Sequence, residues 1–159
     1  MAELRELLSG LGYDDVRTHL QSGNVVLTSK LSAKRLQDEL ERQITDGLGL
    51  EVQVVVRTRD ELADVIERNP LGDVADNPSR YLVNFLSVKP AARVARELAE
   101  ADVAPEQLVV SGREIYAWHP NGIQRSELTK LLSERRLGVN VTARNWNTVT
   151  KLLAIADES

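Results

Sequence analysis

The most distinctive polar segment of the chain lies near its C-terminus, where "TARNWNTVTKL" brings an arginine, two asparagines and a tryptophan to a helix start. Arg144, just before a helix N-terminus, opposes the helix dipole, which indicates a carboxylate partner or a bound anion sharing the N–H groups there. The other residues have a plainer explanation, because Thr142 or Asn145 can cap the helix and Trp146 can stack onto a sheet. The segment is therefore either a helix start that packs a core or an anion pocket.

A second polar segment, "QRSELTK", places Arg125 and Ser126 in the first turn of another helix, where outward N–H groups can hold a phosphate. It lacks the glycine-rich spacing of a P-loop. From both segments we predict a site for a small anionic ligand or a protein partner, in which basic residues neutralise charge and the tryptophan supplies a flat face. The predicted residues are Ser22, Asn24, Arg125, Ser126, Arg144, Asn145, Trp146, Thr148 and Lys151.

The first-half members of this set come from "QSGN", which is most simply a tight turn. Gly23 supplies the positive φ, and Ser22 and Asn24 can bond to local backbone. A second stretch, "SGR" at 111–113, keeps the turn without an asparagine. Turn geometry alone therefore does not dictate Asn24.

The residue types argue against metal and thiol chemistry. The chain has no cysteine, which excludes a disulfide scaffold, a thiolate metal site and a cysteine nucleophile. His19 and His119 are the only histidines, and no H-x₃-H spacing is present. A Ser–His–acid triad would need His119 near Ser111 or Ser126, and no nucleophile-elbow motif supports it. We predict no catalytic residue, no metal and no cofactor, with an enzyme that uses a polar, metal-free site as the second alternative.

Composition is that of an ordinary globular protein, with 42% apolar and 28% charged residues. The net charge of −4 argues against broad binding to a phosphate backbone. Residues 121–151 carry six basic and two acidic side chains, and this local excess of positive charge can steer an anion. No secretory signal and no membrane-spanning run is visible, so we expect a cytoplasmic protein without membrane association.

Hydrophobic periodicity divides the chain into two successions of elements. The first half is predicted to run helix, strand, strand, helix, strand, helix, over residues 2–10, 15–21, 25–29, 33–46, 51–57 and 59–68. Ser32 is the expected cap of its second helix, and Thr58 with Glu61 forms a capping box for the third. After a linker-like stretch at 72–79, the second half is predicted to run strand, helix, strand, strand, helix, strand, helix. Its strands are expected at 80–88, 107–111, 114–118 and 138–142.

The two halves repeat one order of elements at an offset of 89 residues, as "SGN" at 22–24 and "SGR" at 111–113 show. The order β-α-β-β-α-β is the split-βαβ, ferredoxin-like arrangement. We therefore predict an α+β fold of two ferredoxin-like halves packed together, residues 1–72 and 73–159, the first lacking its opening strand. Because a missing inner strand leaves unpaired edges, we expect either an upstream start or another segment in the slot. A homodimer through the open edge is a further expectation.

The alternative function is a nucleic-acid-binding module that uses the second-half sheet. Tyr81 and Phe85 share one face of a predicted strand, and Tyr116 and Trp118 share a face of another. Such rings can stack RNA bases. The acidic balance and the lack of an "RGFGF"-like strand make nucleic acid the less favoured partner.

Four stretches span the whole chain in order: "MAELRELLSGLGYDDVRTHLQSGNVVLTS", "RNPL", "YAWHPNGIQRSELTKLL" and "TARNWNTVTKL". Together they resemble a bacterial family known as domain of unknown function 1697. The resemblance implies an α+β protein of two ferredoxin-like halves and supplies no activity. Family members usually begin upstream with a strand like "ALLRGINVGG". Glu127 stands where many have lysine, and Asn147 where many have arginine or lysine, which removes positive charge near the predicted pocket.

Overall fold

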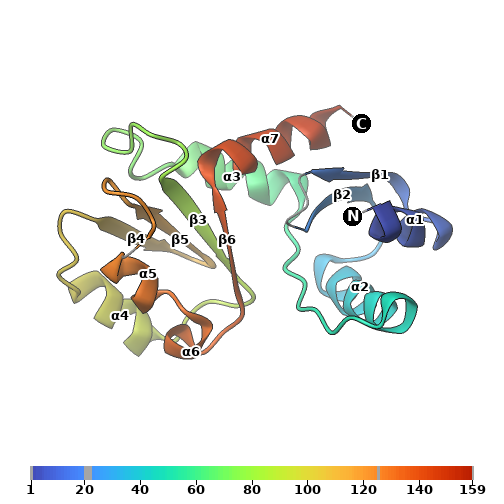
Figure 1. Cartoon of the computed structure of the whole chain (residues 1–159), viewed down its shortest axis with the longest axis horizontal. Coiled ribbons are helices and arrows are strands. Elements are labelled where there is room, and N and C mark those ends of the chain that lie inside the picture. The colour runs from blue at the N-terminus through green and yellow to red at the C-terminus, as the bar shows by residue number, and fades with distance from the viewer. Residues whose placement is uncertain (1, 20–22, 125, 159) are drawn as a thin grey trace. The chain divides into compact units, whose positions relative to one another are not determined.

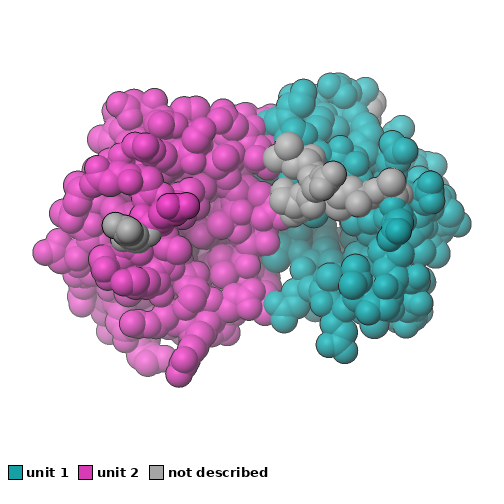
Figure 2. Space-filling model, viewed as in Figure 1, with its two compact units in different colours: residues 1–63, 151–159 teal, residues 64–150 magenta. Residues whose placement is uncertain are grey.

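The computed structural model describes residues 2–19, 23–124 and 126–158. The chain divides into two compact units, which are distinguished in Figure 2: Met1–Ala63 with Lys151–Ser159, and Asp64–Thr150. The described residues form seven helices and two antiparallel sheets, so the predicted α+β class is confirmed (Figure 1). None of the described helices is long and apolar enough to cross a membrane.

The first unit contains a two-stranded antiparallel sheet, β1 (Asp14–His19) and β2 (Asn24–Thr28), with helices α1 (Ala2–Gly10) and α2 (Ala33–Leu48). The N-terminus of α2 lies where the sequence predicts it, because the side chain of Ser32 accepts a hydrogen bond from the backbone N–H of Arg35 at 3.3 Å. The helix ends at Gly49, whose φ of 68° is the left-handed conformation that glycine adopts at little cost. Leu8, Leu36 and Leu40 form the buried cluster of this unit.

The prediction of a strand at 51–57 is wrong. This stretch is irregular up to the start of α3 (Arg59–Arg68), although Val54 and Val56 are half-buried against the cluster of Leu8 and the α2 leucines. A β-branched run becomes a strand only when another strand accepts its backbone hydrogen bonds. In the split order that partner is the opening strand, and the described part of this unit offers only β1 and β2.

The second unit is built on a four-stranded sheet in the order β4-β5-β3-β6, with every neighbouring pair antiparallel. The strands are β3 (Tyr81–Leu86), β4 (Gln107–Ser111), β5 (Glu114–Trp118) and β6 (Val141–Asn145). Helices α4 (Ala92–Glu100), α5 (Glu127–Leu131) and α6 (Glu134–Leu137) lie along one face (Figure 1). Leucines and valines of all three helices share a buried cluster with Leu86, Ile115 and Ala117 of the sheet.

The other face of this sheet carries its aromatic side chains. The Tyr116 hydroxyl donates to the backbone oxygen of Val65 in α3 at 2.7 Å, and the Tyr81 hydroxyl donates to Asn69 Oδ1 at 2.9 Å. Trp146, the first residue of α7 (Trp146–Asp157), stacks on Tyr81. Residues that precede β3 in the chain, Val65 and Asn69, and Trp146, which follows β6, therefore contact this face.

Two boundaries differ from the prediction in ways that matter for the site. The last strand continues to Asn145 rather than ending at Thr142, since β6 pairs with β3 through Arg144 and Asn145. Arg144 therefore belongs to a strand and not to a loop before the helix. The helix predicted to start in "QRSELTK" ends at Leu131, and a second short helix, α6, begins after Ser133, whose side chain caps it.

Candidate functional site

Ser126, a predicted site residue, lies in a buried polar cluster with Glu106 and His119. Its hydroxyl donates to Glu106 Oε2 and accepts from the backbone N–H of Thr129 at 3.1 Å, which makes it the cap of α5. The Nδ1 atom of His119 lies 2.7 Å from Glu106 Oε2 and 3.0 Å from Ser126 Oγ. His119 is only 1% exposed, so these contacts are shielded from water.

Glu106 is the central acceptor of this cluster. Its second oxygen, Oε1, accepts from the backbone N–H of Leu128 in the first turn of α5 at 3.1 Å. Burial alone would raise the pKa of Glu106, but hydrogen bonds from Ser126, the Leu128 backbone and His119 outweigh it and lower the pKa below its usual range. A carboxylate of the chain itself therefore stands at the helix start where the sequence suggested an external phosphate.

The cluster brings a serine, a histidine and an acid together without forming a charge-relay triad. A relay needs the serine at one ring nitrogen and the acid at the other. Here both Ser126 and Glu106 face Nδ1, while Nε2 of His119 is buried with no hydrogen-bond partner among the described residues. The arrangement fastens the loop after β5 to the start of α5 and to the segment before β4.

At the β6–α7 junction the polar residues are used within the fold. Arg144 is paired with Val83 across the sheet, and its Nη1 donates to the backbone oxygen of Ala143 at 2.8 Å. Burial lowers the pKa of Arg144 from its ordinary value. Asn145 Oδ1 accepts from the backbone N–H of Thr148 at 3.0 Å, which confirms Asn145 as the cap of α7.

Trp146 and Thr148 complete this helix start. The indole of Trp146 stacks on Tyr81, and its backbone N–H donates to the Pro78 oxygen at 3.2 Å. Thr148 is buried. The helix-start interpretation of the segment thus accounts for every contact of Asn145 and Trp146 described here.

The remaining predicted residues lie elsewhere. Asn24 is buried in the first unit, where its Nδ2 donates to the backbone oxygen of His19 across the β1–β2 hairpin at 3.0 Å. Lys151 is exposed and belongs to the first unit, whereas Ser126 and the residues at the β6–α7 junction belong to the second. Ser22 and Arg125 are outside the described residues.

Within the second unit the two predicted segments lie at the same end of the sheet. Trp118 at the end of β5 pairs with Tyr81, and Asn145 at the end of β6 pairs with Leu82. Since β3 lies between these strands, His119 and Asn145 are separated by about two strand spacings, roughly 10 Å. The structure therefore places them at one end of the sheet, on strands separated by β3.

The aromatic platform that RNA binding would need is covered. Tyr81, Phe85, Tyr116 and Trp118 are all at most 6% exposed. The two tyrosine hydroxyls bond to Val65 and Asn69, and Trp146 lies against Tyr81. In this structure the rings belong to the core and offer no open face for base stacking.

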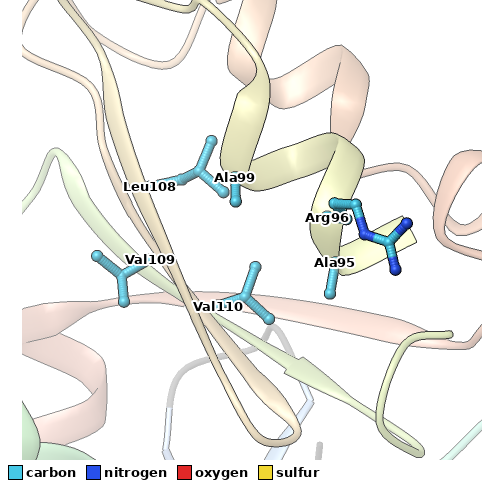
Figure 3. Close-up of a pocket in the computed structure, with 6 residues that line it drawn as sticks. All are labelled: Ala95, Arg96, Ala99, Leu108, Val109 and Val110. Atoms are coloured by element: carbon cyan, nitrogen blue, oxygen red, sulfur yellow. The ribbon is translucent and has the colours of Figure 1, made fainter. Parts of the chain in front are cut away.

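Sequence reasoning missed a groove between α4 and β4, which Figure 3 shows. Its volume is about 520 Å³. The lining residues are Ala95, Arg96 and Ala99 from the helix and Leu108, Val109 and Val110 from the strand. Two features of the sequence could have indicated it. Ala95 and Ala99 lie four residues apart on one helix face, where small side chains leave space, and the strand that follows, β4, has no charged residue.

Comparison with known proteins places the chain in a family. The sequence model of the proteins of unknown function called DUF1697 matches residues 1–116. The chain belongs to this family. The resemblance seen in the sequence is thereby confirmed over residues 1–116, and the match includes α4 and β4 with the groove between them. No curated protein matches the chain at a significant level.

A solved structure has a similar fold. It is that of the conserved bacterial protein SP0830 from Streptococcus pneumoniae, which superposes with a TM-score of 0.77 at 21% sequence identity. The similarity covers 98% of this chain and 88% of the solved one. At that identity the likeness establishes the fold and carries no activity.

Proposed function

We propose that the protein functions by binding a partner protein, and that an extended segment of the partner adds to the sheet at β4. The proposal is carried by the position of this strand at the outside of the sheet, next to a groove. β4 is an outer strand of the sheet, and the groove against α4 runs beside it. An outer strand with an adjoining groove is the usual acceptor for an extended peptide, whose backbone pairs with the edge.

β4 itself carries no protecting residue along most of its length, although Arg68 of α3 donates to the backbone oxygen and the hydroxyl of Ser111 at its last position. Its five residues, Gln107–Ser111, include no charge and no proline, and it pairs with β5 without a register shift. Folded proteins normally protect an open edge with lysine, proline, a bulge or a covering segment. A regular strand whose edge is unprotected along most of its length therefore favours a partner that covers it.

The hairpin geometry indicates which backbone groups are available. A two-residue turn joins Ser111 to Glu114, with Gly112 at a φ of 61° as primed hairpin turns require. Residues that flank such a turn exchange backbone hydrogen bonds, and the pattern alternates along the strand. By this alternation Val109 bonds to β5, while Leu108 and Val110 direct their N–H and C=O groups toward the open edge.

A partner is favoured over the small anionic ligand predicted from the sequence. The first turn of α5 is served by Glu106 and Ser126, and that of α7 by Asn145. An anion would have to displace these groups. The anionic ligand stays a prediction, as does the joint role of Arg144 and Lys151 in holding it.

The finer description of the fold belongs to the same proposal. We assign a ferredoxin-like arrangement to the second half, supported by the strand order β4-β5-β3-β6. The order helix, strand, strand, helix at the start of the chain supports a duplicated unit, with halves at 1–72 and 73–159. We further propose that the protein is bacterial and cytoplasmic. The bacterial origin of the solved protein with a similar fold supports the first part.

Selection from a random peptide display library on the immobilised chain tests this function. The groove variant is Ala99→Gln, which fills the space beside β4, and the matched control is Glu100→Gln at the next, exposed helix position. Peptides that bind the wild type and the control but not the groove variant are the expected result. A selection that enriches no peptide, or only peptides indifferent to Ala99→Gln, would overturn the proposal.

A further inference from the structure

We infer that the segment bound along β4 carries two recognised side chains, two residues apart. One is apolar and lies over Ala99, and the other is acidic and pairs with Arg96. This inference rests on the proposed function and names the chemistry of its partner. Arg96 is the one charged side chain among the described residues that line the groove.

Arg96 is set among apolar lining residues, and Glu100 stands one turn further along α4. The other lining residues are alanine, leucine and valine, and within the described part of the chain Arg96 makes no ion pair or hydrogen bond through its side chain. Figure 3 shows Arg96 beside Ala95 on α4, level with Val110, with its side chain extending from the helix on the side away from β4, while Ala99 and Leu108 lie at the other end. The groove thus has an apolar end and a cationic end.

A strand laid along β4 matches the spacing of these two ends. Side chains on one face of a strand repeat every second residue, at about 6.8 Å. Residues four apart on a helix, such as Ala95 and Ala99, are about 6 Å apart along its axis. One side chain of the added strand can therefore lie over Ala99 and Leu108 while the next on that face reaches Ala95 and Arg96.

The charge of Arg96 decides what the second side chain is. A segment that covers the guanidinium removes part of its water, which is unfavourable unless another group replaces that water. A carboxylate does so with charge-assisted hydrogen bonds, and a guanidinium binds it in a forked geometry. A second copy of β4 would bring glutamine, leucine, valine and serine but no carboxylate, so self-pairing fits this end of the groove less well.

Three matched peptides test the inference. Each is an acetylated, amidated eight-residue peptide of alternating valine and threonine, with glutamate, glutamine or lysine placed two residues after a central valine. They are titrated into the ¹⁵N-labelled full chain, and binding is followed at the β4 and α4 amides. Wild type should bind the glutamate peptide about threefold to fivefold more tightly than the glutamine peptide, and the lysine peptide most weakly.

The variant Arg96→Gln should abolish this preference, while Arg93→Gln, an exposed change on the same helix outside the groove lining, should keep it. The preference should also shrink in 0.5 M salt, because exposed charge pairs are screened. These results would support the inference.

The contrary outcomes separate the two proposals. Equal binding of all three peptides would overturn the acidic partner and leave strand addition standing. No binding of any of them would overturn the inference, and a display selection that also fails would overturn the function. Dimers in light scattering, with β4 resonances that shift as the protein is concentrated, would replace the acidic partner by a second copy of the chain.

Discussion

The indole ring of Trp146 stacks on the phenol ring of Tyr81, with centroids 4.9 Å apart and planes inclined by 22°. Tyr81 begins β3, and Trp146 begins α7, so the stack joins the inner strand to the last helix. The hydroxyl of the same ring donates to Asn69 Oδ1, and the ring is part of the aromatic face of the sheet. The tryptophan that the sequence singled out is thus a structural element of the second unit.

Removing the indole should destabilise the protein moderately. Trp146 is half-buried, so Trp146→Ala should lower the free energy of unfolding by about 2 kcal/mol, less than for a fully buried tryptophan. Trp146→Phe should recover roughly half of the loss, because a smaller ring still stacks on Tyr81. Urea unfolding measures both variants. A loss below about 0.5 kcal/mol for the alanine variant would mean that the stack contributes nothing.

The cap of α7 predicts a second effect. Asn145→Ala removes the acceptor for the Thr148 N–H and should cost about 1 kcal/mol in unfolding free energy. Asn147→Ala, an exposed change in the same turn, is the matched control and should stay within about 0.5 kcal/mol. Thermal or urea unfolding of the two variants compares them directly. Equal losses would contradict the capping role.

Glu106 should make stability depend on pH. Its pKa is lowered in the folded protein, so its carboxylate contributes stability above the ordinary glutamate pKa, and this contribution is lost as pH falls through the folded value. Glu106→Gln should therefore be less stable than wild type by about 1–3 kcal/mol at pH 7. The difference should shrink below pH 4.5, the ordinary pKa of the group.

The control for this prediction is Glu127→Gln, the same change at an exposed position of α5. It should change stability little at any pH, since an exposed ion pair such as that of Glu127 with Lys130 contributes little. Unfolding free energies measured from pH 3 to pH 8 give the comparison. A Glu106→Gln deficit that is as large at pH 3 as at pH 7 would contradict the assigned hydrogen bonds.

Local signals in the sequence predicted the helices well. Ser32 caps α2, and Thr58 and Glu61 form the expected capping box, with the Thr58 N–H 2.9 Å from Glu61 Oε1. Such motifs act between residues that are close in sequence, so their outcome does not depend on the rest of the fold. Strands are different, because they depend on a distant partner. The stretch 51–57 has a strand composition and stays irregular without one.

The candidate sites show the same division. Asn145 as a cap and Trp146 against the sheet follow from local patterns and are confirmed. Glu106 was missed because it lies 20 residues before Ser126 in a loop, and only the pairing of β4 with β5 brings the two together. The groove was missed for a related reason. Two alanines and an uncharged strand become a binding surface only when the strand order leaves β4 outermost.

The measurement that tests the central claim most directly is amide hydrogen exchange by NMR, with and without a saturating display-selected peptide. In the free protein the amides of Leu108 and Val110 should exchange fast and that of Val109 slowly, because of these three residues only Val109 bonds to β5. With the peptide bound, Leu108 and Val110 should become protected by at least tenfold while Val83 in the inner strand stays unchanged. Protection that appears elsewhere, with Leu108 and Val110 still exchanging freely, would contradict strand addition at β4.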